Sequence, residues 1–233
     1  MFVRFFLVFA FFFSIFNSSF CDIRNTEASS DSFSVRLGKL EIPKEFALKE
    51  ILFGDPNASV ELIIYFSYTC PHCRVFHQKE FSKFAKKYVD TGKVKIIFRN
   101  YLDDQGAFDA AQIVRCLCEE RSSKKNRNSL LQYLELSGKI LDKQIQWIKS
   151  ATPVDFLINI FVEAGYQKEK VLYCLSRTDI GAGLMLEQKR AMHQYGLVSM
   201  PVFICGKEIW VGSVTCEELE DFCKLKKLHP VAQ

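Results

Sequence analysis

The sequence predicts an α/β fold in which a central mixed sheet is flanked by helices and carries an inserted all-helical subdomain. Two stretches rich in β-branched and aromatic residues, 60–67 and 94–102, read as buried strands separated by one amphipathic helix. Roughly 80 residues of helical periodicity follow, and a short hairpin and a last helix close the chain. With 233 residues, 48% of them hydrophobic, the chain is long enough to bury a sizeable core.

The first 21 residues have the features of a secretory signal peptide. Arg4 is their only charged residue, and the run from Phe5 to Phe16 contains one polar residue, Ser14. A membrane anchor is the alternative, but a span needs about 20 apolar residues, so we expect cleavage after Cys21. Export would place the mature protein in the periplasm or outside the cell, where disulfides persist.

The next segments lead to the first half of the sheet. Residues 22–50 read as an N-terminal tether with a short edge strand near Phe33–Leu40. The strand at 60–67 is nearly continuous and apolar, as a central strand is. In 74–89 apolar residues recur at intervals of three and four, which is typical of a helix. The strand at 94–102 then completes a β-α-β unit, whose strands are parallel.

Residues 105–180 are expected to form the helical insertion, which divides the chain into a first part, 51–104, and a second part, 181–233. Pro153 fits the first turn of a helix, and Gly165 fits the end of the same helix. The periodic segments of the insertion are 107–120, 129–148, 153–165 and 168–177.

The second part begins with a helix at 183–196, which ends at a glycine. Residues 198–212 read as a loop and a hairpin with a Gly-Lys turn. Thr215 and Glu218 have the spacing of a capping box at the start of the last helix. The order strand–helix–strand, helical block, strand–strand–helix is that of a thioredoxin-like fold.

The central chemical feature is the C-x-x-C pair of Cys70 and Cys73. Cys70 follows a buried strand, so it would lie in the first turn of the next helix, where unpaired N–H groups and the helix dipole favour a thiolate. His72 adds a positive or hydrogen-bonding group, and Pro71 stiffens the helix start. A stabilised thiolate favours the reduced form, which makes the disulfide a strong oxidant. Cys73 would resolve the mixed disulfide.

Two other interpretations of this pair, a zinc site and an inert structural disulfide, are weaker. Zinc needs four ligands, usually from two C-x-x-C pairs, and the sequence contains no second pair of this spacing. A C-x-x-C between a strand and a helix is also more specific for redox chemistry than the motif alone. The net charge of +4 comes from scattered basic residues, which favours no nucleic-acid partner.

A family resemblance rests on three consecutive stretches: "IIYFSYT", then "CPHC", then "RVFHQKEF". Together they resemble the DsbA-like thiol oxidoreductases of the thioredoxin superfamily. The resemblance extends through the helical insertion to "SMPVFICGKEI", and it is greatest to the alphaproteobacterial-type branch, which often has "GKV" before the second strand, as at 92–94. It implies a thioredoxin domain with a helical cap beside the active site.

The resemblance identifies Pro201 as a cis-proline beside the two cysteines. A cis bond there would keep the backbone of Met200 exposed for β-type pairing with an extended substrate. Ser199 and Tyr68 are expected to bind substrate nearby.

The sequence departs from the family pattern at two positions. Members often have Thr or Val where this chain has Met200, and many have a buried acid six residues before the first cysteine, where this chain has Ile64. Glu61 or water would then accept the proton of the resolving cysteine.

The family branch often has cysteines at the positions of Cys116 and Cys174, and some members join them. A Cys116–Cys174 disulfide is therefore one expectation, and the alternative is two buried thiols that pack as small hydrophobes. Cys118 lies about 200° around the helix from Cys116, so both cannot face one partner.

Three further cysteines lie near the C-terminus. Cys216 and Cys223 share a helix face but are about 10 Å apart along its axis, so they cannot bond to each other. Cys205, in the strand after Pro201, is expected to be a core residue. The pairing of these cysteines stays open.

These observations predict a periplasmic thiol:disulfide oxidoreductase that donates its Cys70–Cys73 disulfide to exported proteins. Its partners would be reduced or unfolded exported proteins, and a membrane quinone-linked enzyme or a small oxidant would restore the disulfide. We expect a monomer that needs no organic cofactor, metal or nucleic acid. The nearest alternative is an isomerase or reductase on the same fold, and a non-enzymatic chaperone or redox-sensing module is an alternative of a different class.

Overall fold

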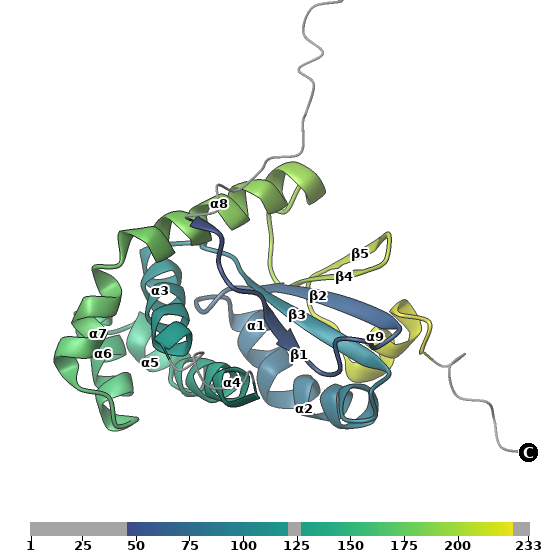
Figure 1. Cartoon of the computed structure of the whole chain (residues 1–233), viewed down its shortest axis with the longest axis horizontal. Coiled ribbons are helices and arrows are strands. Elements are labelled where there is room, and N and C mark those ends of the chain that lie inside the picture. The colour runs from purple at the N-terminus through teal and green to yellow at the C-terminus, as the bar shows by residue number, and fades with distance from the viewer. Residues whose placement is uncertain (1–45, 121–126, 226–233) are drawn as a thin grey trace, which may run out of the picture. The chain divides into compact units, whose positions relative to one another are not determined.

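The structure, a computed structural model, describes residues 46–120 and 127–225 (Figure 1). The expected signal peptide at 1–21 and the edge strand expected near Phe33–Leu40 lie outside these residues. In the part of the chain that is described, no helix is both long and apolar enough to cross a membrane.

A mixed five-stranded sheet forms the centre of the fold, as predicted. Its strands lie in the order β1-β3-β2-β4-β5. β2 and β3 are parallel, and the other three strand pairs are antiparallel. The edge strand β1 was not predicted from the sequence, because it is only three residues long. The bounds are β1 (Ile51–Phe53), β2 (Val60–Phe66), β3 (Val94–Asn100), β4 (Val202–Cys205) and β5 (Glu208–Val211).

One helical stretch connects β2 to β3 and begins at Pro71, in agreement with the predicted helix start at the C-x-x-C pair. It contains two π-helical turns. Phe76 and Phe81 are both buried, with ring centroids 6.5 Å apart, and a wider turn brings residues five positions apart onto one face. The parts are α1 (Pro71–Phe76), η2 (His77–Phe81), α2 (Ser82–Phe84) and η3 (Ala85–Val89).

Among the described residues, six helices separate β3 from β4 and form a helical insertion, as predicted (Figure 1). The last of them had been assigned from the sequence to the second part of the fold, after residue 180. The last helix starts at Thr178, five residues before the start at 183 that was predicted from the sequence. Gly181 and Gly183 lie in its first turns, and a Cβ at Gly183 would come within 2.6 Å of the carbonyl oxygen of Phe46, so the glycine permits a close approach of two backbones. The helices are α3 (Gln105–Glu120), α4 (Arg127–Asp142), α5 (Gln144–Ile148), α6 (Pro153–Glu163), α7 (Lys168–Leu175) and α8 (Thr178–Tyr195).

A disulfide joins Cys116 of α3 to Cys174 of α7, with 5.4 Å between the two Cα atoms. Both residues are fully buried in the core. The bridge links helices whose cysteines are 58 positions apart in the sequence, so it constrains the insertion in the unfolded chain as well as in the folded one.

A buried charged group attaches the insertion to the sheet. Arg115 of α3 is 2% exposed, and its guanidinium donates to the side-chain oxygen of Asn100 at the end of β3. It also forms an ion pair of 3.4 Å with Glu187 of α8, which pairs in turn with Arg99. Because these charges have partners, their burial is tolerated, and they fix α3 and α8 relative to β3.

The predicted helix ends are confirmed by the backbone. Gly196 ends α8 with φ 64°, in the left-handed region that favours glycine. Thr215 and Glu218 form the capping box of the last helix, α9 (Cys216–Phe222).

Candidate redox site

Cys70 lies at the junction of β2 and α1. Its backbone is extended, and its carbonyl oxygen accepts the N–H of Arg74 at 3.2 Å, so it is the N-cap of the helix. Pro71 takes the first helical position, where no N–H is needed. The predicted placement of the C-x-x-C at a helix start is thereby confirmed.

The two thiols of the pair have different surroundings. Cys70 is half-buried, whereas Cys73 is 2% exposed and its sulfur accepts the backbone N–H of Ser67 at 3.5 Å. Neither takes part in a disulfide in this structure. Across the described residues, no group of three or more His, Cys, Asp and Glu side chains is arranged to hold a metal ion.

These surroundings separate the acidities of the two thiols. A hydrogen bond from Cys73 lowers the pKa of Cys70 from 9.0 to about 6, and the backbone groups of Cys73 and His72 add to this effect against the opposing effect of burial. Burial raises the pKa of Cys73 well above 9.0, and the bond to Cys70 raises it further. Cys70 is therefore the thiolate at neutral pH, and Cys73 is the neutral thiol that donates to it.

The loop between α8 and β4 reaches Cys70 from the other side. The Met200–Pro201 peptide bond is cis, and the Cys70 sulfur lies 3.3 Å from the Met200 carbonyl oxygen, to which it can donate only in its protonated form. β4 runs antiparallel to β2, with Val202 opposite Tyr65, so the start of β4 lies beside the end of β2. This register brings residues 130 positions apart into contact.

His72 is exposed beside the pair, and its Nδ1 is 2.9 Å from the hydroxyl oxygen of Ser213. Ser213 was not predicted from the sequence. It follows β5, which returns antiparallel to β4, and the N–H of Gly212 bonds to the carbonyl oxygen of Pro201 at 2.8 Å. The hairpin therefore brings Ser213 to the site, and only the strand register could have indicated this.

Gln144 of α5 is a second residue that the sequence analysis missed. Its side-chain amide donates to the carbonyl oxygens of Tyr68 at 2.8 Å and of Cys70 at 2.9 Å, and it is 2% exposed. The sequence did contain one indication of this role, because Gln144 lies on the same helix face as the buried Trp147. A buried amide needs hydrogen-bond partners, so a glutamine at this position can be expected to hold another part of the chain. The helical insertion thus holds the loop that carries Cys70.

The prediction that Tyr68 binds substrate is wrong. Its side chain is 1% exposed, and its hydroxyl bonds to the hydroxyl of Ser137 at 2.7 Å. Its ring packs edge-on against Phe66. Tyr68 therefore anchors the loop to α4 from inside. Ser199 is exposed, and the side chain of Met200 is buried at 5% exposure, so the backbone of Met200 is the part that faces Cys70.

Ile64 lines a small apolar cavity together with Cys73, so the position of the missing acid does adjoin the resolving cysteine. The suggestion that Glu61 replaces this acid is wrong. Glu61 lies near the opposite end of β2 and pairs with Lys95 at 3.3 Å. At a strand rise of about 3.3 Å per residue it is about 20 Å from Ser67, which bonds to the Cys73 sulfur.

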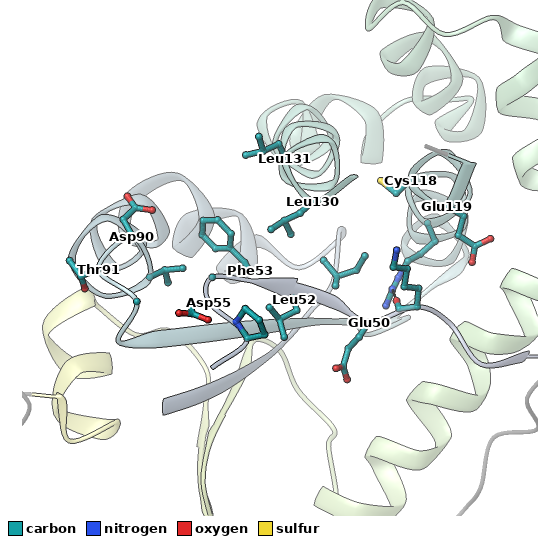
Figure 2. A pocket seen from close by; sticks show the side chains of 17 residues that line it. Glu50, Leu52, Phe53, Asp55, Asp90, Thr91, Cys118, Glu119, Leu130 and Leu131 are labelled. Atoms are coloured by element: carbon teal, nitrogen blue, oxygen red, sulfur yellow. Dashed lines mark hydrogen bonds between the residues drawn. The ribbon is translucent and has the colours of Figure 1, made fainter. Parts of the chain in front are cut away.

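A larger cavity, of about 1050 Å³, lies elsewhere in the fold. Figure 2 shows side chains of β1, α3 and α4 around it, among them Phe53, Cys118 and Leu130. Cys70, Cys73 and Pro201 are not among its lining residues. The candidate redox site is therefore separate from this cavity.

A C-x-x-C pair at the first turn of the helix after β2, facing a cis-proline at the start of β4, defines the class of thioredoxin-fold dithiol proteins. A thioredoxin family model matches residues 47–224, most of the chain. The chain belongs to this family, in its DsbA-like group.

Known relatives agree with this assignment. A Rickettsia prowazekii protein provisionally named protein-disulfide oxidoreductase is 29% identical over 154 residues, which cover 66% of this chain and 53% of the relative. The chain thus spans about half the length of the curated relatives that it matches first. Disulfide bond formation protein D of Bacillus subtilis is 30% identical over 99 residues, 42% of each chain.

Solved structures share the fold. Alpha-DsbA1 of Wolbachia pipientis superposes with a TM-score of 0.67 at 22% identity, over 82% of this chain and 97% of that one. DsbA of Chlamydia trachomatis superposes with a TM-score of 0.67 at 18% identity, over 82% of this chain and 99% of that one. At these identities the likeness shows the fold, including the helical insertion.

Proposed function

We propose that this protein is an exported thiol:disulfide oxidoreductase that introduces disulfide bonds into other proteins through Cys70 and Cys73. The observation that carries the proposal is the contrast between the two thiols. Cys70 is half-buried and has a pKa of about 6, whereas Cys73 is buried and has a raised pKa. This contrast gives each sulfur one role in thiol–disulfide exchange.

The reaction starts from the Cys70–Cys73 disulfide. A substrate thiolate attacks the accessible sulfur of Cys70, a mixed disulfide forms, and Cys73 leaves with the electron pair and takes up a proton. The Ser67 N–H stabilises the departing sulfur. A second substrate thiolate attacks the substrate sulfur of the mixed disulfide, the substrate disulfide forms, and Cys70 leaves as a thiolate. Its low pKa makes it a good leaving group.

The loop before the cis-proline offers a surface for an extended substrate chain. Ser199 is exposed, and Val198 beside it is 82% exposed. The Met200 carbonyl oxygen, which lies 3.3 Å from the Cys70 sulfur, would accept a substrate backbone N–H once Cys70 is bonded to the substrate. Recognition through backbone groups suits an enzyme that meets many unfolded sequences.

The cellular setting forms part of the same proposal. The apolar segment at 1–21 supports export to the periplasm, where reduced exported proteins are the substrates. Turnover leaves Cys70 and Cys73 reduced, so a quinone-linked membrane enzyme or a small-molecule oxidant must reoxidise them. The protein acts as a monomer in this scheme.

Trapping the mixed disulfide tests the proposal. The oxidised protein, mixed with an equimolar reduced peptide containing two cysteines, should oxidise the peptide stoichiometrically. The variant Cys73→Ser, preloaded as a Cys70 mixed disulfide with a small thiol and then mixed with a peptide that has one cysteine, should accumulate a peptide–protein disulfide, and Cys70→Ser should give neither product. Cys118→Ser, which changes a buried cysteine away from the site, is the matched control. Equal peptide oxidation by Cys70→Ser and the control would refute the proposal.

A further inference from the structure

A second pair of thiols lies outside the redox site, at the other end of β4. Cys205 is the last residue of β4, and Cys223 follows α9 as its C-cap. From the sequence, Cys205 was expected to be a core residue, and its pairing was left open. In the structure the two thiols lie close enough for each to shift the pKa of the other.

The backbone elements that carry these two cysteines are packed together. Cys205 is the register partner of Glu208 in β5, and the carboxylate of Glu208 is 4.0 Å from the Nζ of Lys224, the residue after Cys223. The ring of Phe222, the residue before Cys223, meets the ring of Trp210 in β5 edge to face, with 6.0 Å between the ring centroids. The contact between the thiols is therefore part of a continuous contact between the hairpin and the end of α9.

The two thiols differ in the same way as the pair of the redox site. Cys205 is half-buried, and Cys223 is 8% exposed. Proximity to the Cys223 thiol lowers the pKa of Cys205 despite the opposing effect of burial, and the charge of Lys224 adds to the lowering. Proximity to Cys205, together with burial, raises the pKa of Cys223. Cys205 is thus the accessible nucleophile.

Cys216 does not compete for either partner. It is the first residue of α9, and its thiol donates to the carboxylate of Glu220 at 3.7 Å. Burial next to this carboxylate raises the pKa of Cys216 to about 11. Cys216 therefore stays a neutral thiol at neutral pH. Its partner is Glu220, and not Cys205 or Cys223.

We propose that Cys205 and Cys223 are a second dithiol site, which a disulfide-containing oxidant converts to a disulfide that ties α9 to the β4–β5 hairpin. The thiolate of Cys205 attacks one sulfur of the oxidant, a mixed disulfide forms, and the first thiolate of the oxidant leaves. Cys223 gives up its proton and attacks the Cys205 sulfur, the Cys205–Cys223 bond forms, and the second thiolate leaves. Two protein thiols are oxidised and one oxidant disulfide is reduced to two thiols.

A Cys205–Cys223 disulfide would affect the redox site through Ser213. Ser213, which contacts His72, lies within the segment that the Cys205–Cys223 bond would close. The bond would fix both ends of this segment and thereby restrict the position of Ser213.

The test is a peptide map of the variant Cys70→Ser/Cys73→Ser, which lacks the first pair, after equilibration with glutathione disulfide. Free thiols are blocked with N-ethylmaleimide, and the protein is digested with trypsin without reduction. Cleavage after Arg190, Lys207 and Lys224 places Cys205 on one peptide and both Cys216 and Cys223 on another. Adding Cys216→Ser to the variant leaves Cys223 as the single partner on the second peptide.

We expect the two peptides to be joined in the Cys216→Ser background and to be separate when Cys223→Ser replaces it. The natural protein is mapped in parallel. Fragmentation of its joined peptide should show that Cys205 is bonded to Cys223, without any substitution near α9. Three results would overturn the proposal: both cysteines blocked by N-ethylmaleimide, Cys205 held as a glutathione adduct, or a bond to Cys216. Because Cys70 and Cys73 are absent from the tested variant, the outcome is independent of the proposed function.

Discussion

Gln144 donates a hydrogen bond of 2.9 Å to the backbone carbonyl oxygen of Cys70, so a residue of the helical insertion holds the first turn of the redox helix. The same amide group bonds to the carbonyl oxygen of Tyr68. The insertion is therefore a structural support for the C-x-x-C loop as well as a cover beside it.

Replacing Gln144 by Ala should loosen this loop. The buried carbonyl oxygen of Tyr68 loses the amide donor, and that of Cys70 keeps only the N–H of Arg74, so we expect the free energy of unfolding to fall by about 2 kcal/mol and the pKa of Cys70 to change. Urea unfolding and the pH dependence of alkylation measure the two effects. Gln146→Ala, on the exposed face of the same helix, is the matched control. If both variants unfold and titrate alike, Gln144 does not support the site.

The reactivity of Cys70 should follow its low pKa. In the reduced protein, iodoacetamide should modify Cys70 with a rate that rises through a midpoint at pH about 6 and levels off by pH 8, because the thiolate is the reagent. Cys73 should stay unmodified over this range, because burial raises its pKa. A midpoint near pH 9 would show that the surroundings of Cys70 do not stabilise its thiolate.

The same shift makes the stability of the reduced protein depend on pH. Between about 6 and 9.0 the unfolded chain keeps a proton on Cys70 that the folded chain has lost, so stability rises with pH across this window. The contribution is complete above pH 9 and disappears as the pH falls through 6. The difference in Tm between reduced natural protein and Cys70→Ser, measured from pH 5 to 8.5, should grow with pH. A constant difference would contradict the account.

The Cys116–Cys174 bridge should contribute to stability without serving the chemistry. It closes a span of 58 positions, so the chain-entropy model gives about 4 kcal/mol for its loss in Cys116→Ala/Cys174→Ala. Cys118→Ala, a buried cysteine on the same helix outside the bridge, controls for lost packing. Denaturant unfolding under non-reducing conditions measures both. A double variant as stable as the control would show that the bridge adds nothing.

Ser213 should tune the redox site through His72. Ser213→Ala removes the contact with Nδ1, so the His72 ring and the helix start that carries it are held less firmly, and the backbone N–H of His72 is a less constant donor to Cys70. The thiolate is then less stabilised, the reduced form is less favoured, and the reduction potential should fall by on the order of 20 mV. Ser82→Ala, on an exposed helix face, should leave it unchanged. An equal or higher potential in Ser213→Ala would rule out this role.

Local sequence signals were sufficient for the features that depend on neighbouring residues. The apolar run at 60–67 predicted β2, Gly196 predicted the end of α8, and Thr215 predicted the N-terminal cap of α9. The cis-proline was expected from family resemblance, since a proline at a strand start is compatible with either isomer.

The errors and omissions concern tertiary relationships. Gln144 and Ser213 are brought to the site by helix packing and strand register, which no local pattern contains. Tyr68 follows the strand at a turn, where alternation no longer indicates which side chain is buried, and it faces inward. Glu61 was considered for its charge, but its place on β2 puts it at the wrong end of the strand.

The most direct test of the central claim is the reduction potential of the Cys70–Cys73 pair, measured by equilibrating the protein in glutathione buffers and trapping the thiols. The accessory cysteines are followed by mass so that only this pair is counted. The thiolate of Cys70 and the buried thiol of Cys73 predict a potential above about −200 mV, in the range of disulfide donors. A potential below about −250 mV, in the range of reductases, would contradict the proposed function.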